Sequence, residues 1–224
     1  MCGRFTLTAT PTDIKEAFPE VEVPSDLAPR FNIAPSQPVA VIANTGVNRV
    51  ELYRWGLVPS WAKDPGIGDR LINARAETIA EKPSFRRVYR RRRCLVLADG
   101  FYEWRQEPGN RLKTPMYIRL ASGRPFAFAG VWDVWRPPEG DLLHSCAIIT
   151  TAPNALMQVI HNRMPVILPQ DAYTRWLDPN EQPPENLDTL LAPFPADAMT
   201  AYPVSRFVNS PQNEGPGCIA AVQP

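Results

Sequence analysis

The pattern of apolar and polar positions along the chain predicts many short elements rather than long helices. Apolar residues alternate with polar ones, or form short runs, between residues that favour turns, which is typical of β-strands. The segments with this pattern are residues 38–44, 50–55, 93–98, 100–105, 116–120, 125–131 and 145–151. Asn44-Thr45-Gly46 indicates a turn after the first of them, and Asp99-Gly100 separates the strands 93–98 and 100–105.

Short helices are expected between and after these strands. The predicted helical segments are residues 12–18, 84–92, 154–161, 172–177 and 187–191. Thr12-Asp13 is expected to cap the first helix, and Asn154 the third. Strands with interspersed helices predict an α+β fold, in which a curved, mostly antiparallel mixed sheet carries short peripheral helices. The length of 224 residues suits a single domain over residues 1–224.

Composition narrows the classes of protein that the chain could represent. No apolar run approaches the roughly 18 residues of a membrane span, and Arg4 interrupts any N-terminal signal peptide. We therefore expect a cytoplasmic protein without membrane contact, associated with the nucleoid if DNA is its partner. Four scattered cysteines without a CxxC pair, and only two histidines, argue against a structural zinc site. No metal or other cofactor is predicted.

Charge is distributed unevenly although the net charge is only +1. Residues 1–132 contain 20 Lys and Arg against 13 Asp and Glu, whereas residues 133–224 contain 4 against 10. Attraction of the first part to phosphates is one reading. The other reading is chance, because the two parts interleave in the folded chain.

Cys2 becomes the N-terminal residue if Met1 is trimmed, and it then offers an amine and a thiol on adjacent carbons. The amine, with an ordinary pKa of about 7.7–8.0, can attack an aldehyde to form a Schiff base. The thiol can then close on the imine carbon as a five-membered thiazolidine, helped by its proximity. From position alone, an ordinary residue at a frayed end is the favoured interpretation of Cys2.

Two further residues are candidates for proton transfer. Glu103 lies among aromatic residues in the segment 98–104, where its pKa is expected to be raised, although an exposed strand glutamate is the commoner case. His161 precedes Asn162-Arg163-Met164-Pro165, which suggests a fixed loop, and imidazole can move protons at neutral pH. The other histidine, His144, is expected to be structural.

Polar and aromatic residues elsewhere could bind a nucleic acid. Asn73 and Arg75 follow a short apolar run, so Asn73 could orient a reacting group and Arg75 could bind a phosphate, while Glu77 could pair with an arginine. Residues 85–93 contain six arginines, which is most often a solvated helix face but can also reach phosphates. Trp61, on a loop containing Gly and Pro, could stack on a base if exposed.

Seven motifs in order carry a resemblance to a known family. They are Met1-Cys2-Gly3-Arg4-Phe5, Arg30-Phe31-Asn32-Ile33-Ala34-Pro35, Trp55-Gly56-Leu57-Val58-Pro59, Asn73-Ala74-Arg75-Ala76-Glu77-Thr78, Ala98-Asp99-Gly100-Phe101-Tyr102-Glu103-Trp104, His161-Asn162-Arg163-Met164-Pro165 and Pro203-Val204-Ser205. Together they resemble the SOS response-associated peptidase family, also called abasic site processing proteins, over residues 2 to about 209.

The resemblance implies a fold, a partner and a set of site residues. It implies a curved central sheet with a basic channel for single-stranded DNA, and a crosslink between the N-terminal cysteine and the opened sugar of an abasic site. The implied reacting residues are Cys2 as nucleophile with Asn73, Glu103 and His161 around it. The implied DNA ligands are Arg4, Arg75 and Arg86, with Arg86 assigned among several arginines of the run, and Trp61 at the lesion. A monomer without metal or cofactor is expected.

Two other functions stay open on the residues. A cysteine peptidase or N-terminal-nucleophile hydrolase would use the Cys2 thiolate on an amide, although only Met1 precedes Cys2 and we expect no leader to cut. A non-catalytic module that binds single strands would leave Cys2 without a role.

Overall fold

A computed structural model describes residues 2–107, 109 and 112–222, and this part of the chain contains thirteen strands. The strands are β1 (Phe5–Leu7), β2 (Arg30–Ile33), β3 (Pro38–Ala43), β4 (Glu51–Trp55), β5 (Asn73–Arg75), β6 (Arg93–Ala98), β7 (Gly100–Arg105), β8 (Thr114–Leu120), β9 (Phe126–Trp135), β10 (Leu143–Thr151), β11 (Met164–Pro165), β12 (Ile167–Leu168) and β13 (Met199–Pro203). The helices are α1 (Pro11–Ala17), α2 (Arg86–Arg91), α3 (Ala155–Gln158), α4 (Tyr173–Trp176) and α5 (Pro184–Asp188), and short 3-10 turns join several elements.

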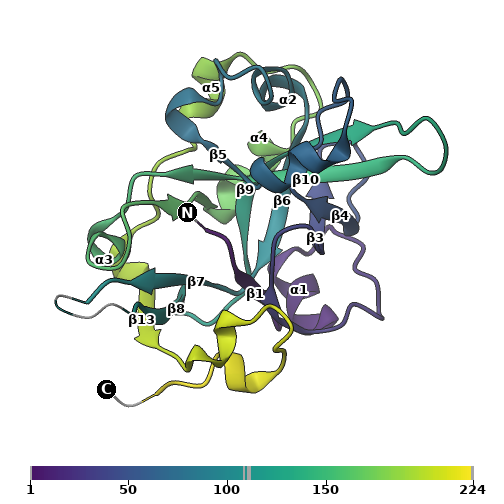
Figure 1. The fold of residues 1–224 in the computed structure, drawn as a ribbon. Helices are drawn as coiled ribbons and strands as arrows, with labels where there is room; N and C mark the ends of the chain where they lie inside the picture. Colours follow the sequence, from purple (N-terminus) through teal and green to yellow (C-terminus); the bar gives the residue numbers. More distant parts are fainter. Residues whose placement is uncertain (1, 108, 110–111, 223–224) are drawn as a thin grey trace.

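The strands form two sheets instead of the single curved sheet that the sequence suggested, while the α+β class and the mostly antiparallel pairing are confirmed. One sheet has the order β13-β8-β7-β1-β2. The other runs β11-β10-β4-β3-β6-β9-β12, and it closes into a barrel because β9 also pairs with β10. In Figure 1 the N-terminal segment lies between the barrel strands and the β7–β8 layer.

The passage from one sheet to the other occurs at Asp99-Gly100, between β6 and β7. Asp99 accepts hydrogen bonds from the backbone N–H groups of Thr8 and Ala9, which ties the corner to the chain after β1. A Cβ on Gly100 would lie 2.2 Å from the hydroxyl oxygen of Tyr117, so only glycine fits. The predicted break between the two strands is therefore the corner of the molecule.

The core lies where β1 crosses the barrel. Phe5 makes edge contacts with Trp55 and Phe128, at ring-centroid distances of 5.0 and 5.7 Å, and Phe101 contacts Phe128 at 6.0 Å. All four rings are buried. Burial of each such side chain contributes about 1.5–3 kcal/mol, so β1 is held firmly against the barrel just after Cys2.

The helices are short and lie at the periphery, as predicted. α1 begins one residue earlier than expected, because Thr10 caps it and forms a reciprocal capping box with Asp13, with Pro11 in the first turn. Thr12 is not the cap. Asn154 does cap α3, accepting the N–H of Met157 at 2.9 Å. α2 buries Val88 and turns its arginines outward.

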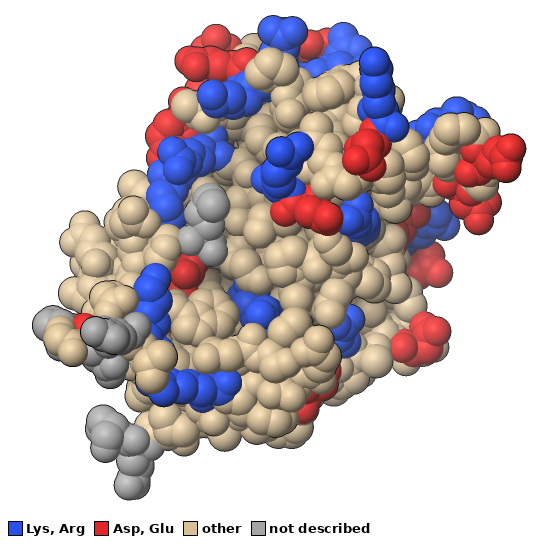
Figure 2. Space-filling model, viewed as in Figure 1, with Lys and Arg blue, Asp and Glu red and all other residues tan. Residues whose placement is uncertain are grey.

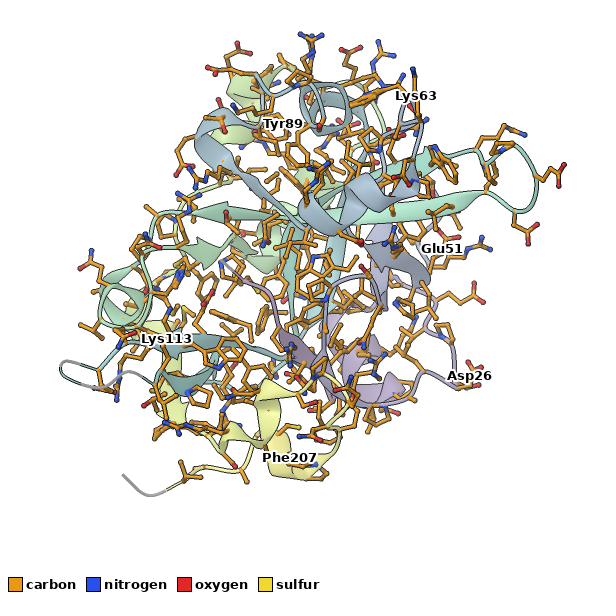
Figure 3. All side chains as sticks on the ribbon, viewed as in Figure 1. Asp26, Glu51, Lys63, Tyr89, Lys113 and Phe207 are labelled. Atoms are coloured by element: carbon orange, nitrogen blue, oxygen red, sulfur yellow. The ribbon has the colours of Figure 1, made fainter. Side chains whose placement is uncertain are left out.

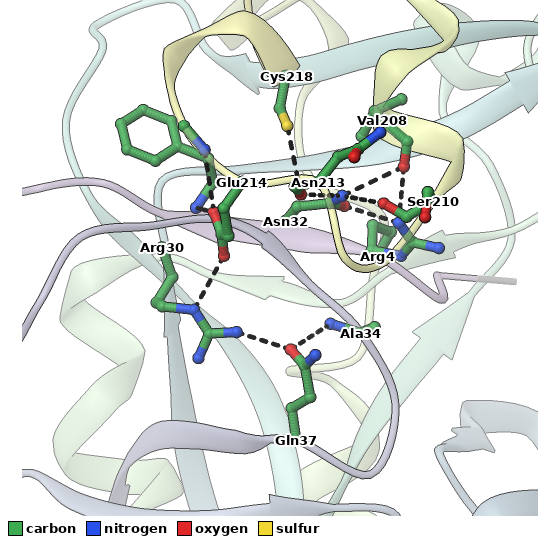
Figure 4. Close-up of polar contacts among 12 residues, drawn as sticks. Arg4, Arg30, Asn32, Ala34, Gln37, Val208, Ser210, Asn213, Glu214 and Cys218 are labelled. Carbon is green, nitrogen blue, oxygen red and sulfur yellow. Dashed lines mark hydrogen bonds and ion pairs between the residues drawn. The ribbon is translucent and has the colours of Figure 1, made fainter.

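The segment after β13 folds back on β2 and forms what we call the C-terminal clasp, residues 206–218 (Figure 4). The buried amide of Asn32 donates to the carbonyl oxygens of Ser210 and Asn213, at 2.9 and 2.8 Å, and accepts from Arg4 at 2.7 Å. Glu214 accepts the backbone N–H of Phe31 at 2.8 Å. The C-terminal clasp thus contacts both β2 and Arg4, which precedes β1.

Some classes of feature are not found in the described part of the chain. No helix there has both the length and the apolar character needed to cross a membrane. No group of three or more His, Cys, Asp or Glu side chains among the described residues is arranged to hold a metal ion. The four cysteines are buried free thiols.

Candidate active site

The site begins at Cys2, whose side chain is fully buried ahead of β1. The side-chain amide of Asn73 donates to the Cys2 carbonyl oxygen at 2.8 Å. Asn73 is the first residue of β5, and the parallel pairing of β5 with β10 fixes its position. Burial, assisted by the carboxylate of Glu103, raises the pKa of the Cys2 thiol. The thiol is therefore protonated at rest.

Asn73 presents a second polar atom to the same place. Its Oδ1 is buried and has no hydrogen-bond partner among the residues that the structure describes. A buried acceptor without a partner is costly, so it favours a donor supplied by a bound molecule or by the Cys2 amine.

Glu103 approaches from β7, where it pairs with Met116 of β8. The N–H of Tyr102 donates to the Arg4 carbonyl oxygen at 2.9 Å, so the backbone before β1 runs alongside β7 toward Glu103. The Glu103 side chain is buried, and burial raises the pKa of its carboxyl group, as the sequence predicted. Glu103 can therefore carry a proton closer to neutral pH than an exposed glutamate.

His161 completes the group from the loop before β11. Its Nε2 lies 3.9 Å from Oε2 of Glu103, too long for a hydrogen bond but close enough for an ion pair when the imidazole is protonated. The backbone N–H of Arg163 donates to Nδ1 of His161 at 3.1 Å. The Arg163 carbonyl oxygen also lies 3.2 Å from Nδ1, so the loop backbone holds the ring with Nε2 facing Glu103.

The predicted ion pair of Glu77 holds the His161 loop in place. The guanidinium of Arg163 binds both carboxylate oxygens of Glu77, at 2.6 and 3.0 Å, and donates to the Thr150 carbonyl oxygen at 2.6 Å. The hydrogen bonds from Arg163 lower the pKa of Glu77. Arg163 was not predicted as a site residue, because the pairing of β10 with both β5 and β11 brings it to Glu77.

The predicted DNA ligands differ in their surroundings. Arg75 is exposed and lines a hollow of about 510 Å³ together with His161 and Arg163. Arg86 is exposed on α2, and Trp61 is 60% exposed on its loop. Arg4 is engaged internally: its Nη1 donates to Asn32 Oδ1 and to the Val208 carbonyl oxygen, both at 2.7 Å. Burial lowers the pKa of Arg4.

The arginine run is not uniformly solvated. Arg93 is fully buried, and its guanidinium donates to backbone carbonyl oxygens that include those of Trp176, at 2.8 Å, and Arg90, at 2.6 Å. Arg90 and Arg91 both pair with Glu181 at the surface. Figure 2 shows Lys and Arg side chains on both sides of the hollowed region in which the N-terminal segment lies.

Four residues from distant parts of the chain thus converge, and they define a candidate active site around a buried cysteine: Cys2, Asn73, Glu103 and His161. A model of the family described as SOS response associated peptidase (SRAP) matches residues 1–211, and the chain belongs to this family.

Relatives and solved structures support the same grouping. The chain is 50% identical to the abasic site processing protein YoqW of Bacillus subtilis, over 98% of this chain and 99% of that protein. It is 32% identical to the abasic site processing protein HMCES of Xenopus tropicalis, over 99% of this chain and 78% of that protein. A crystal structure of a Bacteroides thetaiotaomicron protein superimposes with a TM-score of 0.88 at 29% identity, over 99% of this chain and all of that one.

Proposed function

We propose that this protein binds single-stranded DNA and forms a covalent crosslink between Cys2, exposed by removal of Met1, and the aldehyde of a ring-opened abasic sugar. The observation that supports it best is the meeting of the Cys2 backbone, the Asn73 amide, and the Glu103–His161 pair at one buried point. Relatives named abasic site processing proteins support the same substrate. Met1 itself lies outside the described residues.

The proposed reaction releases one water. The Cys2 amine attacks C1′ of the aldehyde, and a proton moves from nitrogen to oxygen to give a carbinolamine. Loss of water leaves an imine. The thiol sulfur then adds to C1′ while its proton passes to the nitrogen, which closes the five-membered thiazolidine. The thiol thus supplies both the sulfur that bonds to C1′ and the proton that the ring nitrogen gains.

The neighbouring side chains suit separate parts of this sequence. Glu103, with its raised pKa, can donate a proton to the departing hydroxyl and, once ionised, support a protonated amine. His161, with its Nε2 directed at Glu103, can exchange protons with the sugar ring oxygen during ring opening and reversal. Asn73 fixes the Cys2 backbone through its amide nitrogen and can accept the amine N–H with its Oδ1.

Arg75, Arg86 and Arg4 are the proposed phosphate ligands, with Trp61 stacked at the lesion. In this role the crosslink would shield the lesion during the response to DNA damage. We further propose that the protein is a monomer that acts in the cytoplasm and joins the nucleoid when bound to DNA. Cleavage of the strand at the abasic site, a lyase activity, is a proposed side reaction of the same imine.

The peptidase reading is the second candidate, and one observation bears against it. A cysteine peptidase needs a thiolate, but burial and the Glu103 carboxylate favour the protonated Cys2 thiol. A peptidase is therefore disfavoured in the resting site.

Intact-mass measurement tests the proposal. After mixing with a single strand whose uracil has been excised, we expect an adduct with the mass of the trimmed protein plus the strand less one water. Cys2→Ala should lose this adduct and keep its binding to undamaged strand. Equal crosslinking by Cys2→Ala would overturn the thiazolidine mechanism, and turnover of peptides without DNA would favour the peptidase.

A further inference from the structure

The loop that carries Trp61 is fastened to the barrel on both sides of the indole. The N–H of Ser60 donates to Oδ2 of Asp133 at 2.9 Å, and the indole N–H of Trp135 donates to the Ala62 carbonyl oxygen at 2.7 Å. Asp133 and Trp135 lie two positions apart on β9, so the same strand holds the residue before Trp61 and the residue after it. Trp61 stands out between these anchors with 60% of its surface exposed.

Asp133 also reaches the arginine run. Its carboxylate is almost wholly buried, with 4% of the side chain exposed, and it forms an ion pair with Arg92. Nη2 of Arg87 lies 3.9 Å from Oδ1 of Asp133 and donates to Oγ of Ser60 at 3.3 Å. One carboxylate therefore binds the backbone next to Trp61 and two arginines of the run.

Arg87 is the exposed arginine of the run that contacts the Trp61 loop. Its side chain is 60% exposed, so the guanidinium edge that does not face Ser60 remains available to solvent. Arg90 and Arg91 pair with Glu181 instead, and Arg93 is buried. Arg86 is also exposed, but in the described part of the chain no hydrogen bond or ion pair joins it to the Trp61 loop.

The surroundings of Trp61 suit a nucleotide. A hollow of about 550 Å³ beside the indole is lined by Lys63 and Arg70, along with Asp64 and Ile67. Figure 3 places Lys63 and Tyr89 of α2 at the same end of the molecule. An exposed, immobilised indole flanked by cationic side chains has the properties of a base-stacking platform, since any base can stack on it and its phosphate can meet a guanidinium.

We propose that Trp61 and Arg87 act as one unit on a single nucleotide, the indole against the base and the guanidinium on its phosphate. Asp133 is the positioning residue that fixes their spacing. This inference rests on the proposed binding of single-stranded DNA, and it adds Arg87 to the phosphate ligands predicted from the sequence.

A double-mutant cycle tests the inference. The probe is a fluorescently labelled single strand that carries tetrahydrofuran in place of the abasic sugar, so that no aldehyde is present and only non-covalent binding is measured at fixed salt. We expect Trp61→Ala to raise Kd about tenfold and Arg87→Ala about fivefold. In the double variant, the rise in Kd should be smaller than the product of the two single rises by about threefold or more. The reason is that either single change already disrupts the nucleotide contact that the two residues share.

Arg86→Ala is the matched control, since it removes the same charge from the same helix. Its effect should multiply with that of Trp61→Ala. Independent effects of Trp61 and Arg87, or coupling of Trp61 to Arg86 instead, would overturn the inference. Absence of any binding by the wild-type protein would instead overturn the proposed function itself.

The positioning role has its own measurement. Asp133→Asn keeps an acceptor for the Ser60 N–H but lacks the charge that holds Arg87, so the Trp61–Arg87 coupling should disappear. Ser60→Ala removes only the hydroxyl that Arg87 contacts and should weaken the coupling with no change in Tm, which keeps the test decisive if Asp133→Asn fails to fold. Full coupling in a folded Asp133→Asn or in Ser60→Ala would contradict the role of Asp133.

Discussion

The amide of Asn73 holds the backbone of Cys2, donating to its carbonyl oxygen across 2.8 Å, although 71 positions separate the two residues. This contact fixes the position of the residue that reacts in our proposal. It uses only the Cys2 carbonyl oxygen, so the amine and the thiol stay available to react with the substrate. A loss of the donor should therefore affect the reaction more than the fold.

We expect Asn73→Ala to slow crosslinking about tenfold or more, because the Cys2 carbonyl loses a hydrogen bond worth about 0.5–1.5 kcal/mol and the amine loses its orientation. Single-turnover kinetics at saturating DNA measures the rate. Asn73→Asp is the matched variant: it has nearly the same shape, but its carboxylate cannot donate to the carbonyl. A wild-type rate in both variants would refute the role of Asn73.

Glu103→Gln should change both the reaction and the pH dependence of stability. The folded-state pKa of Glu103 is raised by burial, so its ionised form destabilises the fold. This penalty is absent below the ordinary glutamate pKa of about 4.3 and grows as pH rises through the folded-state pKa. We expect Glu103→Gln to gain stability relative to wild type between pH 4 and neutral pH in urea titrations, and to crosslink more slowly. A stability difference independent of pH would contradict this assignment.

Glu77→Gln should loosen the His161 loop with little cost to the fold. The folded-state pKa of Glu77 is lowered by Arg163, so the stability it contributes is present above its ordinary pKa and is lost as pH falls through the folded value. Because the Glu77 side chain is half exposed, this contribution should stay below about 1 kcal/mol. Crosslink formation and reversal should slow, since Arg163 also orients His161. Unchanged kinetics would show that Thr150 alone suffices to hold Arg163.

Arg93→Met should destabilise the protein by about 3 kcal/mol or more, because buried carbonyl oxygens that Arg93 satisfies lose their donors. Thermal or urea unfolding measures the loss. Arg90→Ala is the control from the same run, and its exposed pair with Glu181 predicts a change within about 0.5 kcal/mol. An equal loss of unfolding free energy in the two variants would show that the buried hydrogen bonds of Arg93 do not stabilise the fold more than a surface ion pair does.

A lysine inserted between Met1 and Cys2 tests the requirement for a free Cys2 amine. The inserted chain is expected to retain its leading residues, to bind the strand that carries tetrahydrofuran, and to fail to crosslink an abasic strand. The control variant has the same lysine inserted directly after Gly109, on the connection between β7 and β8. This variant should crosslink at the wild-type rate. Crosslinking by the first variant would show that the α-amine of Cys2 is dispensable.

Much of the fold was predictable from local pattern, but its arrangement was not. The strands around residues 93–98 and 100–105 follow from their apolar content, whereas the corner at Gly100 depends on Tyr117, which approaches from β8. Similarly, the six arginines resemble one charged helix face, and the burial of Arg93 follows from carbonyl groups more than 80 positions away.

The candidate site was predictable only through the family's motifs. The spacing of Cys2, Asn73 and His161 in the sequence carries no sign that they meet. The pairing of β10 with β5 and with β11 brings Asn73 and the His161 loop together, and Asn73 then binds the Cys2 backbone. Arg87 and Asp133 were not identified for the same reason, since a loop contact from β9 joins them.

The C-terminal clasp has a consequence for the order of events during synthesis. Its carbonyl groups reach Arg4 and Asn32, and they belong to residues 208–213, which are synthesised after both. Until then Arg4 and β2 lack these contacts, so the N-terminus should remain open to the aminopeptidase that trims methionine. We expect maturation of Cys2 to precede closure of the clasp on Arg4 and Asn32.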